Sequence, residues 1–260
     1  MKKTNSKDGT PIAFWESGSG PPLLLVHGTT ADHTRWSAIS PRFEQHFTVY
    51  AMDRRGRGQS GDSPDYNFLR EAEDVAAVVD AIGESVFVLG HSYGALCTLE
   101  AALLTKGISR LILYEPPLPT GTPLFPRDLP GQMQSLLDKG QQEEALVLFL
   151  RNGPKMPDHE LKAYRQLPVW PTRVSLAPTI PREIQIDSTY KFDAEKFAGL
   201  EVQTLLLLGG DSPYFFHEGI RLLDSALPKS QITVLPGQQH IAMDTNPDLF
   251  AAETLQFLLA

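Results

Sequence analysis

The sequence predicts an α/β fold, a doubly wound and mostly parallel sheet with a helical segment inserted between two of its strands. Short runs rich in leucine and valine recur along the chain and end in glycine or other turn residues. Most of these runs are continuously apolar, which is typical of strands buried on both faces of a parallel sheet. Helical patterns lie between several of them, and such alternation of strand and helix favours a doubly wound sheet.

Seven strands are expected, at residues 12–15, 23–26, 47–52, 86–89, 110–114, 204–208 and 232–235. Helices are expected at residues 69–82, 93–105, 220–226 and 247–259. In the first of these helices Val75, Val78 and Val79 fall on one face, as expected of a helix that packs on a sheet. Glu71 lies in its first turn, where the helix dipole stabilises an anion.

The alternation stops between residues 116 and 199. This stretch is rich in proline and shows one clear helix at 132–151, with shorter helical fragments at 160–166 and 182–186. No strand of the sheet type is visible in it. We therefore expect residues 1–115 and 200–260 to form the core and residues 116–199 to form a helical lid over the edge of the sheet.

Composition restricts the partners of the protein. The 260 residues carry a formal net charge of −8, and such an acidic surface repels phosphate backbones and anionic lipids. We expect a small-molecule substrate and no nucleic-acid or membrane partner, while the oligomeric state is left open. A single cysteine, no apolar region behind the basic N-terminus and no apolar run near ~20 residues predict a cytoplasmic protein.

The strongest motif is the pentapeptide at residues 90–94, Gly-His-Ser-Tyr-Gly, which fits G-x-S-x-G. It follows an apolar run and precedes a helical stretch, which is the strand–turn–helix setting that this motif requires. A nucleophile on such a sharp turn has a strained backbone and needs small neighbours. The turn also puts Ser92 at the N-terminus of a helix, where developing negative charge is stabilised.

With this motif the chain resembles the α/β-hydrolase superfamily, and the resemblance covers nearly all of it. Three further landmarks occur in the family's order: His-Gly-Thr-Thr at 27–30, Asp-Arg-Arg-Gly-Arg-Gly-Gln-Ser at 53–60, and Gly-Gln-Gln-His at 237–240. The resemblance implies the α/β-hydrolase fold with an inserted lid. The segment 53–60 is interpreted as architecture, a turn held by side-chain to backbone hydrogen bonds.

The resemblance also implies roles for individual residues. Ser92 would be the nucleophile and His240, after the last strand, its general base. The backbone N–H groups of Thr29 and Tyr93 would form the oxyanion hole, so the Thr29 side chain is not required. The other six histidines lack this setting, and structural or surface roles are expected for them.

The acid of the triad is where the sequence departs from the family pattern. The usual G-x-x-D after the penultimate strand is replaced by Gly-Gly-Asp-Ser at 209–212, which puts Asp211 one residue early. Glu115, at the end of the strand 110–114, is a second candidate, because some relatives take their acid from that strand. We place Asp211 slightly ahead of Glu115.

Aromatic residues are candidates for lining a pocket under the lid: Trp36, Trp170, Tyr190, Phe215 and Phe216. Cys97, one turn into the helix after the motif, is expected to pack on the sheet rather than react. No metal-ligand spacing and no nucleotide fingerprint is visible, so we expect no metal and no cofactor.

The first functional hypothesis is a serine hydrolase that cleaves a small ester, thioester or lactone through an acyl-enzyme. Family members use the same residues for other reactions, and carbon–carbon bond hydrolysis and a cofactor-free perhydrolase or chloroperoxidase-like activity are alternatives. Amide hydrolysis belongs to the same group. Hydroxynitrile lyase chemistry is a separate class, which would use the same serine and histidine without an acyl-enzyme. An alternative of another class is a non-catalytic small-molecule receptor on the same fold.

Overall fold

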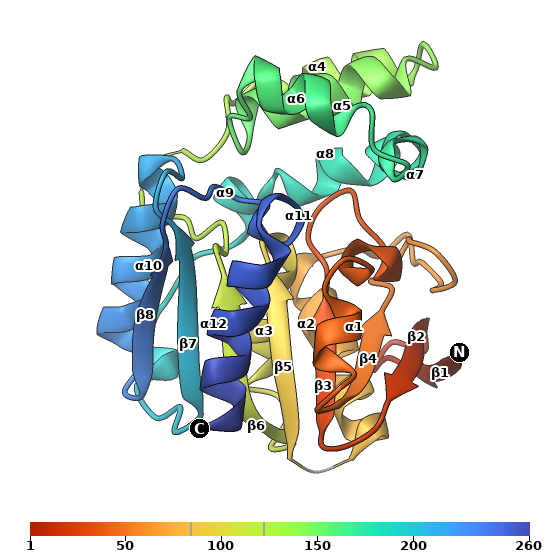
Figure 1. The fold of residues 1–260 in the computed structure, drawn as a ribbon. Helices are drawn as coiled ribbons and strands as arrows, with labels where there is room; N and C mark the ends of the chain where they lie inside the picture. Colours follow the sequence, from red (N-terminus) through yellow and green to blue (C-terminus); the bar gives the residue numbers. More distant parts are fainter. Residues whose placement is uncertain (84, 122) are drawn as a thin grey trace.

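A computed structural model describes residues 1–83, 85–121 and 123–260, and eight strands of this part form one sheet in the order β1-β2-β4-β3-β5-β6-β7-β8 (Figure 1). The strand β2 pairs antiparallel with β1 and with β4, and all other pairs are parallel. The strands are β1 (Lys2–Asn5), β2 (Pro11–Gly18), β3 (Pro22–Val26), β4 (Thr48–Met52), β5 (Val86–His91), β6 (Ile108–Tyr114), β7 (Gln203–Gly209) and β8 (Ser230–Leu235). The predicted doubly wound, mostly parallel sheet is confirmed.

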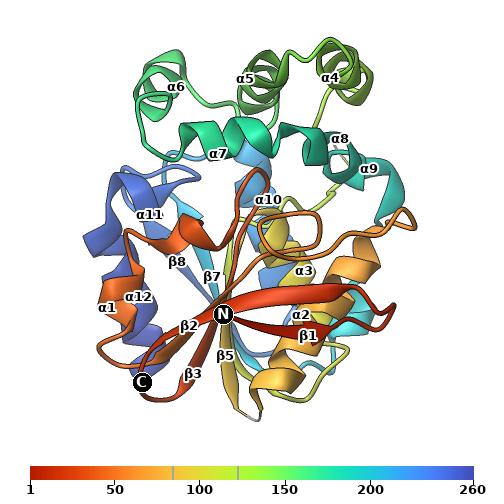
Figure 2. The same ribbon diagram turned by 90° about the vertical axis from the view of Figure 1, so that its right-hand side faces the viewer.

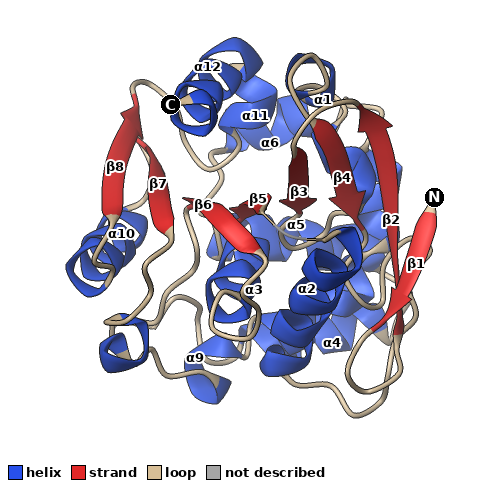
Figure 3. Ribbon diagram, turned by 90° about the horizontal axis from the view of Figure 1, so that it is seen from below, coloured by secondary structure: helices blue, strands red, loops and turns tan. Residues whose placement is uncertain are grey.

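Helices cover both faces of this sheet (Figure 3). One face carries α2 (Phe68–Ile82), α3 (Tyr93–Ala101) and α10 (Tyr214–Ala226). The other carries α1 (Ser40–Phe43), α11 (Ala242–Thr245) and α12 (Pro247–Leu259), beside the 3₁₀ turn His33–Trp36. The strand β3 shows why the runs are continuously apolar: Leu24 and Val26 belong to the first apolar cluster, and Leu23 and Leu25 to the second.

The sequence missed the edge strand β1. Its residues are polar and mostly exposed, so it carries none of the apolar pattern that identifies the inner strands. The helix expected at 220–226 begins earlier, at Tyr214, and Phe216 in its first turn is buried on the same face as Ile220 and Leu223. The helix expected at 93–105 is shorter than predicted and ends at Ala101.

Among the described residues between β6 and β7, six helices form a layer above the carboxyl edge of the sheet (Figures 1 and 2). They are α4 (Leu129–Leu137), α5 (Gln142–Asn152), α6 (Asp158–Tyr164), α7 (Trp170–Ser175), α8 (Ile180–Glu183) and α9 (Ile186–Thr189). Short 3₁₀ turns lie at Ala177–Thr179 and Ala194–Phe197. The single helix expected at 132–151 is wrong: Gly140, with φ of 72°, separates α4 from α5.

This layer, residues 116–199, is called the cap below. Much of it is held by an apolar cluster of its own, with Met133, Leu146 and Phe149 among its members. Ile186 and Phe197, by contrast, pack into the main core beside α3. The division of the chain at 116 and 199 stays a proposal, and the packing supports an end of the separate cap near residue 184.

In the part of the chain that the structure describes, none of the helices combines the length and the apolarity that a membrane crossing requires.

Candidate active site

Ser92 lies on the turn between β5 and α3, in a backbone conformation that few non-glycine residues adopt. Its φ and ψ are 55° and −127°, and its N–H donates to the Tyr114 carbonyl at 2.8 Å. This turn and the loop after β3 approach each other so closely that each must have a glycine at the contact. A Cβ on Gly94 would lie 2.2 Å from the His27 carbonyl oxygen, and one on Gly28 would lie 2.8 Å from the Ser92 Cβ. The turn is therefore held against the loop after β3.

His240 comes to Ser92 from the loop after β8. Its Nε2 lies 2.9 Å from the Ser92 Oγ, and its side chain is 13% exposed. Its backbone carbonyl accepts from His91 Nε2 at 2.9 Å, and the Tyr114 hydroxyl donates to the neighbouring Gln239 carbonyl. Phe216 stacks on the imidazole at 4.5 Å between ring centroids. The position of the imidazole is therefore fixed by hydrogen bonds to the backbone of its loop and by aromatic stacking on one face of the ring.

Glu115 is the carboxylate that meets His240. Its Oε2 accepts from His240 Nδ1 at 2.6 Å, and its Oε1 accepts from the Gly209 N–H at 2.7 Å. The side chain is fully buried, and the residue has φ of 46° directly after β6. Ser92, His240 and Glu115 form a continuous hydrogen-bonded chain of the type that activates a serine hydroxyl.

The preference for Asp211 over Glu115 is corrected by this geometry. Asp211 is exposed, and its side chain makes no hydrogen bond to any described residue. Its backbone N–H donates to the Gln238 carbonyl at 2.9 Å, so it serves the turn rather than the imidazole. The next residue, Ser212, occupies the position at which the family pattern expects the acid. The strand β6 lies directly beside β5, which brings Glu115 close to the turn that carries Ser92.

Thr29 and Tyr93, predicted to supply the oxyanion hole, border the same cavity as Ser92. Their backbone N–H groups have no acceptor among the described residues, whereas the N–H groups of Ala95 and Leu96 already bond the Ser92 carbonyl. Tyr93 is the first residue of α3, so its N–H points out of the helix end. Both N–H groups remain available to an oxygen near Ser92.

The other titratable groups near Ser92 do not compete with His240. Burial lowers the pKa of His91 and of His27 well below the usual value for histidine, so both imidazoles are neutral at pH 7. Burial also raises the pKa of the Cys97 thiol well above its usual value. Cys97 is therefore a packing residue on α3, as the sequence predicted. Within the described residues no group of three or more histidine, cysteine or acidic side chains is arranged to hold a metal ion.

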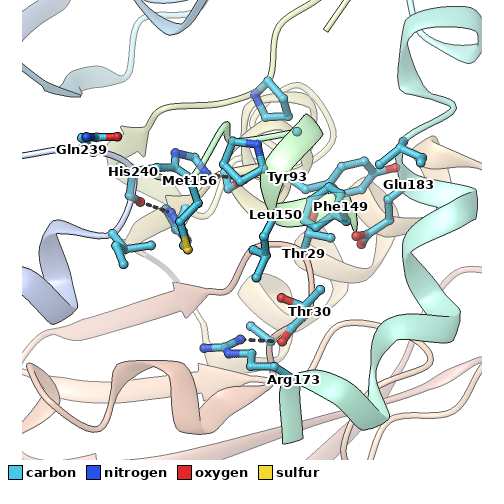
Figure 4. Close-up of a pocket in the computed structure, with 18 of the residues that line it drawn as sticks. Thr29, Thr30, Tyr93, Phe149, Leu150, Met156, Arg173, Glu183, Gln239 and His240 are labelled. Carbon is cyan, nitrogen blue, oxygen red and sulfur yellow. Dashed lines mark hydrogen bonds between the residues drawn. The ribbon is translucent and has the colours of Figure 1, made fainter. Parts of the chain in front are cut away.

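A cavity separates Ser92 and His240 from the cap (Figure 4). Phe215 and Phe216 line it, as predicted. The prediction is wrong for Trp36, which is buried between the sheet and α12. It is also wrong for Trp170, which packs inside the cap. Both tryptophans fill hydrophobic clusters instead of the cavity. Tyr190 likewise lies outside the cavity and donates to Glu100 at 2.6 Å.

Cap residues that no motif marked complete the cavity wall: Phe125, Phe149, Leu150, Met156, Tyr164, Arg173, Glu183 and Ile184. One of them, Glu183, is fully buried between Arg54 and Arg57, and Arg54 also bonds Glu71 at 2.7 Å. The basic turn after β4 thus attaches the cap to the core, which agrees with its interpretation as architecture.

The structure combines a doubly wound sheet, a serine on the sharp turn after β5, an imidazole that faces it, and a cap over the cavity. These features together define the class of hydrolases that have this type of sheet. Residues 23–253 match the alpha/beta hydrolase family, and the chain belongs to that family. It is similar over its whole length to the crystal structure of an alpha/beta hydrolase from Sphaerobacter thermophilus DSM 20745. The identity is 36%, the TM-score is 0.87, and 99% of this chain and 100% of that one are covered.

Two further similarities bear on activity. The crystal structure of the esterase RhEst1 from Rhodococcus sp. ECU1013 has a TM-score of 0.79 at 25% identity, covering 100% of this chain and 98% of that one. N-formylmaleamate deformylase from Pseudomonas putida (strain KT2440) is 36% identical over 124 residues, which is 46% of each chain. The chain spans less than half the length of the curated relatives it matches.

Proposed function

We propose that the protein is a serine hydrolase that cleaves a small ester, thioester or lactone through an acyl-enzyme. The observation that carries the proposal is the 2.9 Å contact between His240 Nε2 and the Ser92 Oγ, with Glu115 behind the imidazole at 2.6 Å. A serine hydroxyl is a weak nucleophile until such a base accepts its proton. The similarity to an esterase of known structure supports the same reaction class.

The proposed reaction has two halves. The Ser92 Oγ attacks the carbonyl carbon while His240 takes its proton, and the resulting oxyanion accepts hydrogen bonds from the Thr29 and Tyr93 N–H groups. His240 then gives the proton to the leaving oxygen or sulfur, and the acyl-enzyme remains. Water, deprotonated by His240, attacks the acyl-enzyme carbonyl, and Ser92 leaves with that proton as the acid product departs.

Turnover of 4-nitrophenyl acetate tests the proposal. We expect a burst of nitrophenolate from the wild-type protein, none from Ser92→Ala, and labelling of Ser92 by a fluorophosphonate that is confirmed by peptide mass. Labelling with negligible turnover of esters of every chain length would favour the receptor alternative. Absence of both would contradict the serine mechanism itself.

A second candidate is hydrolysis of a carbon–nitrogen bond in an N-acyl amide. It is favoured by the similarity to N-formylmaleamate deformylase, which covers 46% of each chain. The same triad would attack the acyl carbon, and His240 would protonate a leaving nitrogen instead of an oxygen. Comparing kcat/KM for an N-formyl imide and for a formate ester of matched size distinguishes the two candidates.

A further inference from the structure

Arg173, on the cap helix α7, differs from every other buried arginine in the part of the chain that the structure describes. Four other arginines are nearly fully buried, and each of them contacts at least one carboxylate: Arg35, Arg54, Arg55 and Arg57. Arg173 is 2% exposed and forms no ion pair with a described residue. Its Nη1 donates to the Thr30 carbonyl at 2.6 Å (Figure 4).

The rest of this guanidinium has no acceptor. The Nε and Nη2 atoms of Arg173 are both buried, and neither has a hydrogen-bond partner among the described residues. A charged donor that is buried without an acceptor is costly, and such a group therefore calls for an acceptor from outside the described residues. Burial lowers the pKa of Arg173, yet a guanidinium keeps its proton at neutral pH.

The two unpartnered nitrogens lie on one edge of the guanidinium. The N–H of Nε and one N–H of Nη2 point in parallel, which is the edge that binds both oxygens of a carboxylate at once. The Thr30 carbonyl occupies the other end of the group through Nη1 and holds the side chain in place. A bidentate site for a planar anion is therefore already oriented.

Arg173 borders the cavity that contains Ser92. Arg173, Ser92 and His240 line the same space, and the Tyr164 hydroxyl beside them also has no hydrogen bond to a described residue. The charge of Arg35 is offset by Asp244, and that of Glu183 by Arg54 and Arg57. Glu160, the remaining carboxylate of the lining, is partly exposed and makes no hydrogen bond or ion pair with Arg173. The cavity wall thus contains one cation, Arg173, without a carboxylate partner among the described residues, in a lining that also includes Glu160.

We propose that Arg173, together with the Tyr164 hydroxyl, binds a carboxylate of the substrate, so that the substrate class is an ester or amide that also carries a carboxylate group. This inference rests on the proposed function, since it assigns the substrate of the same cavity. Arg173 is a specificity residue in this scheme and takes no part in bond cleavage.

Two matched pairs of esters test the assignment and locate the carboxylate. On the acyl side, 4-nitrophenyl hydrogen adipate is compared with its neutral methyl ester. On the leaving-group side, 4-carboxyphenyl acetate is compared with its methyl ester. For one of the two pairs, the wild-type protein is expected to favour the charged member by about tenfold or more in kcat/KM.

The Arg173→Met variant should remove this preference. We expect its kcat/KM for the favoured charged ester to fall about 30-fold more than its value for the neutral partner, mainly through KM. Arg173→Lys, which keeps the charge but loses the bidentate edge, should fall between them. Arg165→Met is the control, because Arg165 is a half-exposed cap arginine outside the cavity. Equal losses on charged and neutral esters in Arg173→Met would overturn the assignment.

A binding measurement separates this inference from the proposed function. In Ser92→Ala, glutarate should bind more tightly than its uncharged diamide, glutaramide, by calorimetry. The difference should vanish when Arg173 is also replaced by methionine and should become smaller when it is replaced by lysine. If no ester is hydrolysed but this difference is present, the serine-hydrolase proposal fails and the carboxylate site stands. If neutral esters are hydrolysed through Ser92 and glutarate binding does not depend on Arg173, the carboxylate site is wrong and the hydrolase stands.

Discussion

The edge of the sheet and the cap hold their functional groups in different ways. Ser92 and Glu115 lie on turns of positive φ directly after β5 and β6, and backbone hydrogen bonds join these turns to the neighbouring strands. Arg173 and Glu183 lie on short cap helices, and both residues reach the core through side-chain contacts. The proposed reacting groups thus depend on the backbone of the sheet, while the cap residues depend on side-chain contacts that a substitution can remove.

The largest effect is expected where the imidazole loses its carboxylate. Glu115→Gln should lower kcat by about 10⁴-fold, because His240 loses the acceptor that fixes its orientation and stabilises its charged form. Asp211→Asn is the matched control at the edge of the sheet and should change kcat less than about threefold. Ester kinetics on both purified variants measure this, and the reverse ranking would restore Asp211 as the acid.

The attachment of the cap is tested by Glu183→Gln. This change leaves Arg54 and Arg57 without the full negative charge that they share, and we expect it to reduce the free energy of unfolding by about 3 kcal/mol. Asp62→Asn removes a carboxylate from an ion pair of Arg182 that is partly exposed, and about 0.5 kcal/mol is expected. Urea unfolding of the two variants compares them. Equal losses of stability would mean that the buried ion pairs of Glu183 hold the cap to the core no more strongly than the partly exposed pair of Asp62 does.

A smaller loss is expected from Gly28→Ala. The added methyl would lie 2.8 Å from the Ser92 Cβ, so the turn must shift and the nucleophile moves away from its base. We expect kcat to fall about 10²-fold with little change in KM, as typical of a misplaced reacting group. Gly131→Ala in the cap helix α4 is the control, since its Cβ meets nothing within 4 Å. Full activity in Gly28→Ala would show that the turn accepts the added methyl group without displacing Ser92 from His240.

The smallest effect is expected from Thr29→Ala. The proposed oxyanion donor at this position is the backbone N–H, which the substitution keeps, so kcat/KM should change less than about threefold. Steady-state kinetics with a neutral ester provide the measurement. A loss near that of Gly28→Ala would mean that the threonine hydroxyl itself contacts the substrate.

The sequence predicted the sheet and the pairing of Ser92 with His240 because local patterns determine both. A strand buried on both faces must be apolar throughout, and an elbow requires small residues at fixed positions around its serine. Glu115 and Asp211 could not be separated in this way. Their distances to His240 depend on the order of strands in the sheet and on the turn after each strand, and neither is visible in a linear pattern.

The cavity wall was predicted least well for a related reason. Large aromatic residues such as Trp36 and Trp170 gain most by filling a hydrophobic core, so aromatic character alone does not identify a lining residue. Arg173 carried no signal, because an arginine in an irregular helical segment is usually solvated. Only its burial without a carboxylate partner distinguishes it.

The loop that carries His240 is anchored by two side chains of the sheet, His91 on β5 and Tyr114 on β6. Neither anchor belongs to the cap. Grafting the helices of another family member onto this scaffold, or trimming them, should therefore leave the proton relay aligned while it changes which molecules enter. Evolution and protein engineering can in this way alter substrate selectivity through the cap while the arrangement of Ser92, His240 and Glu115 stays the same.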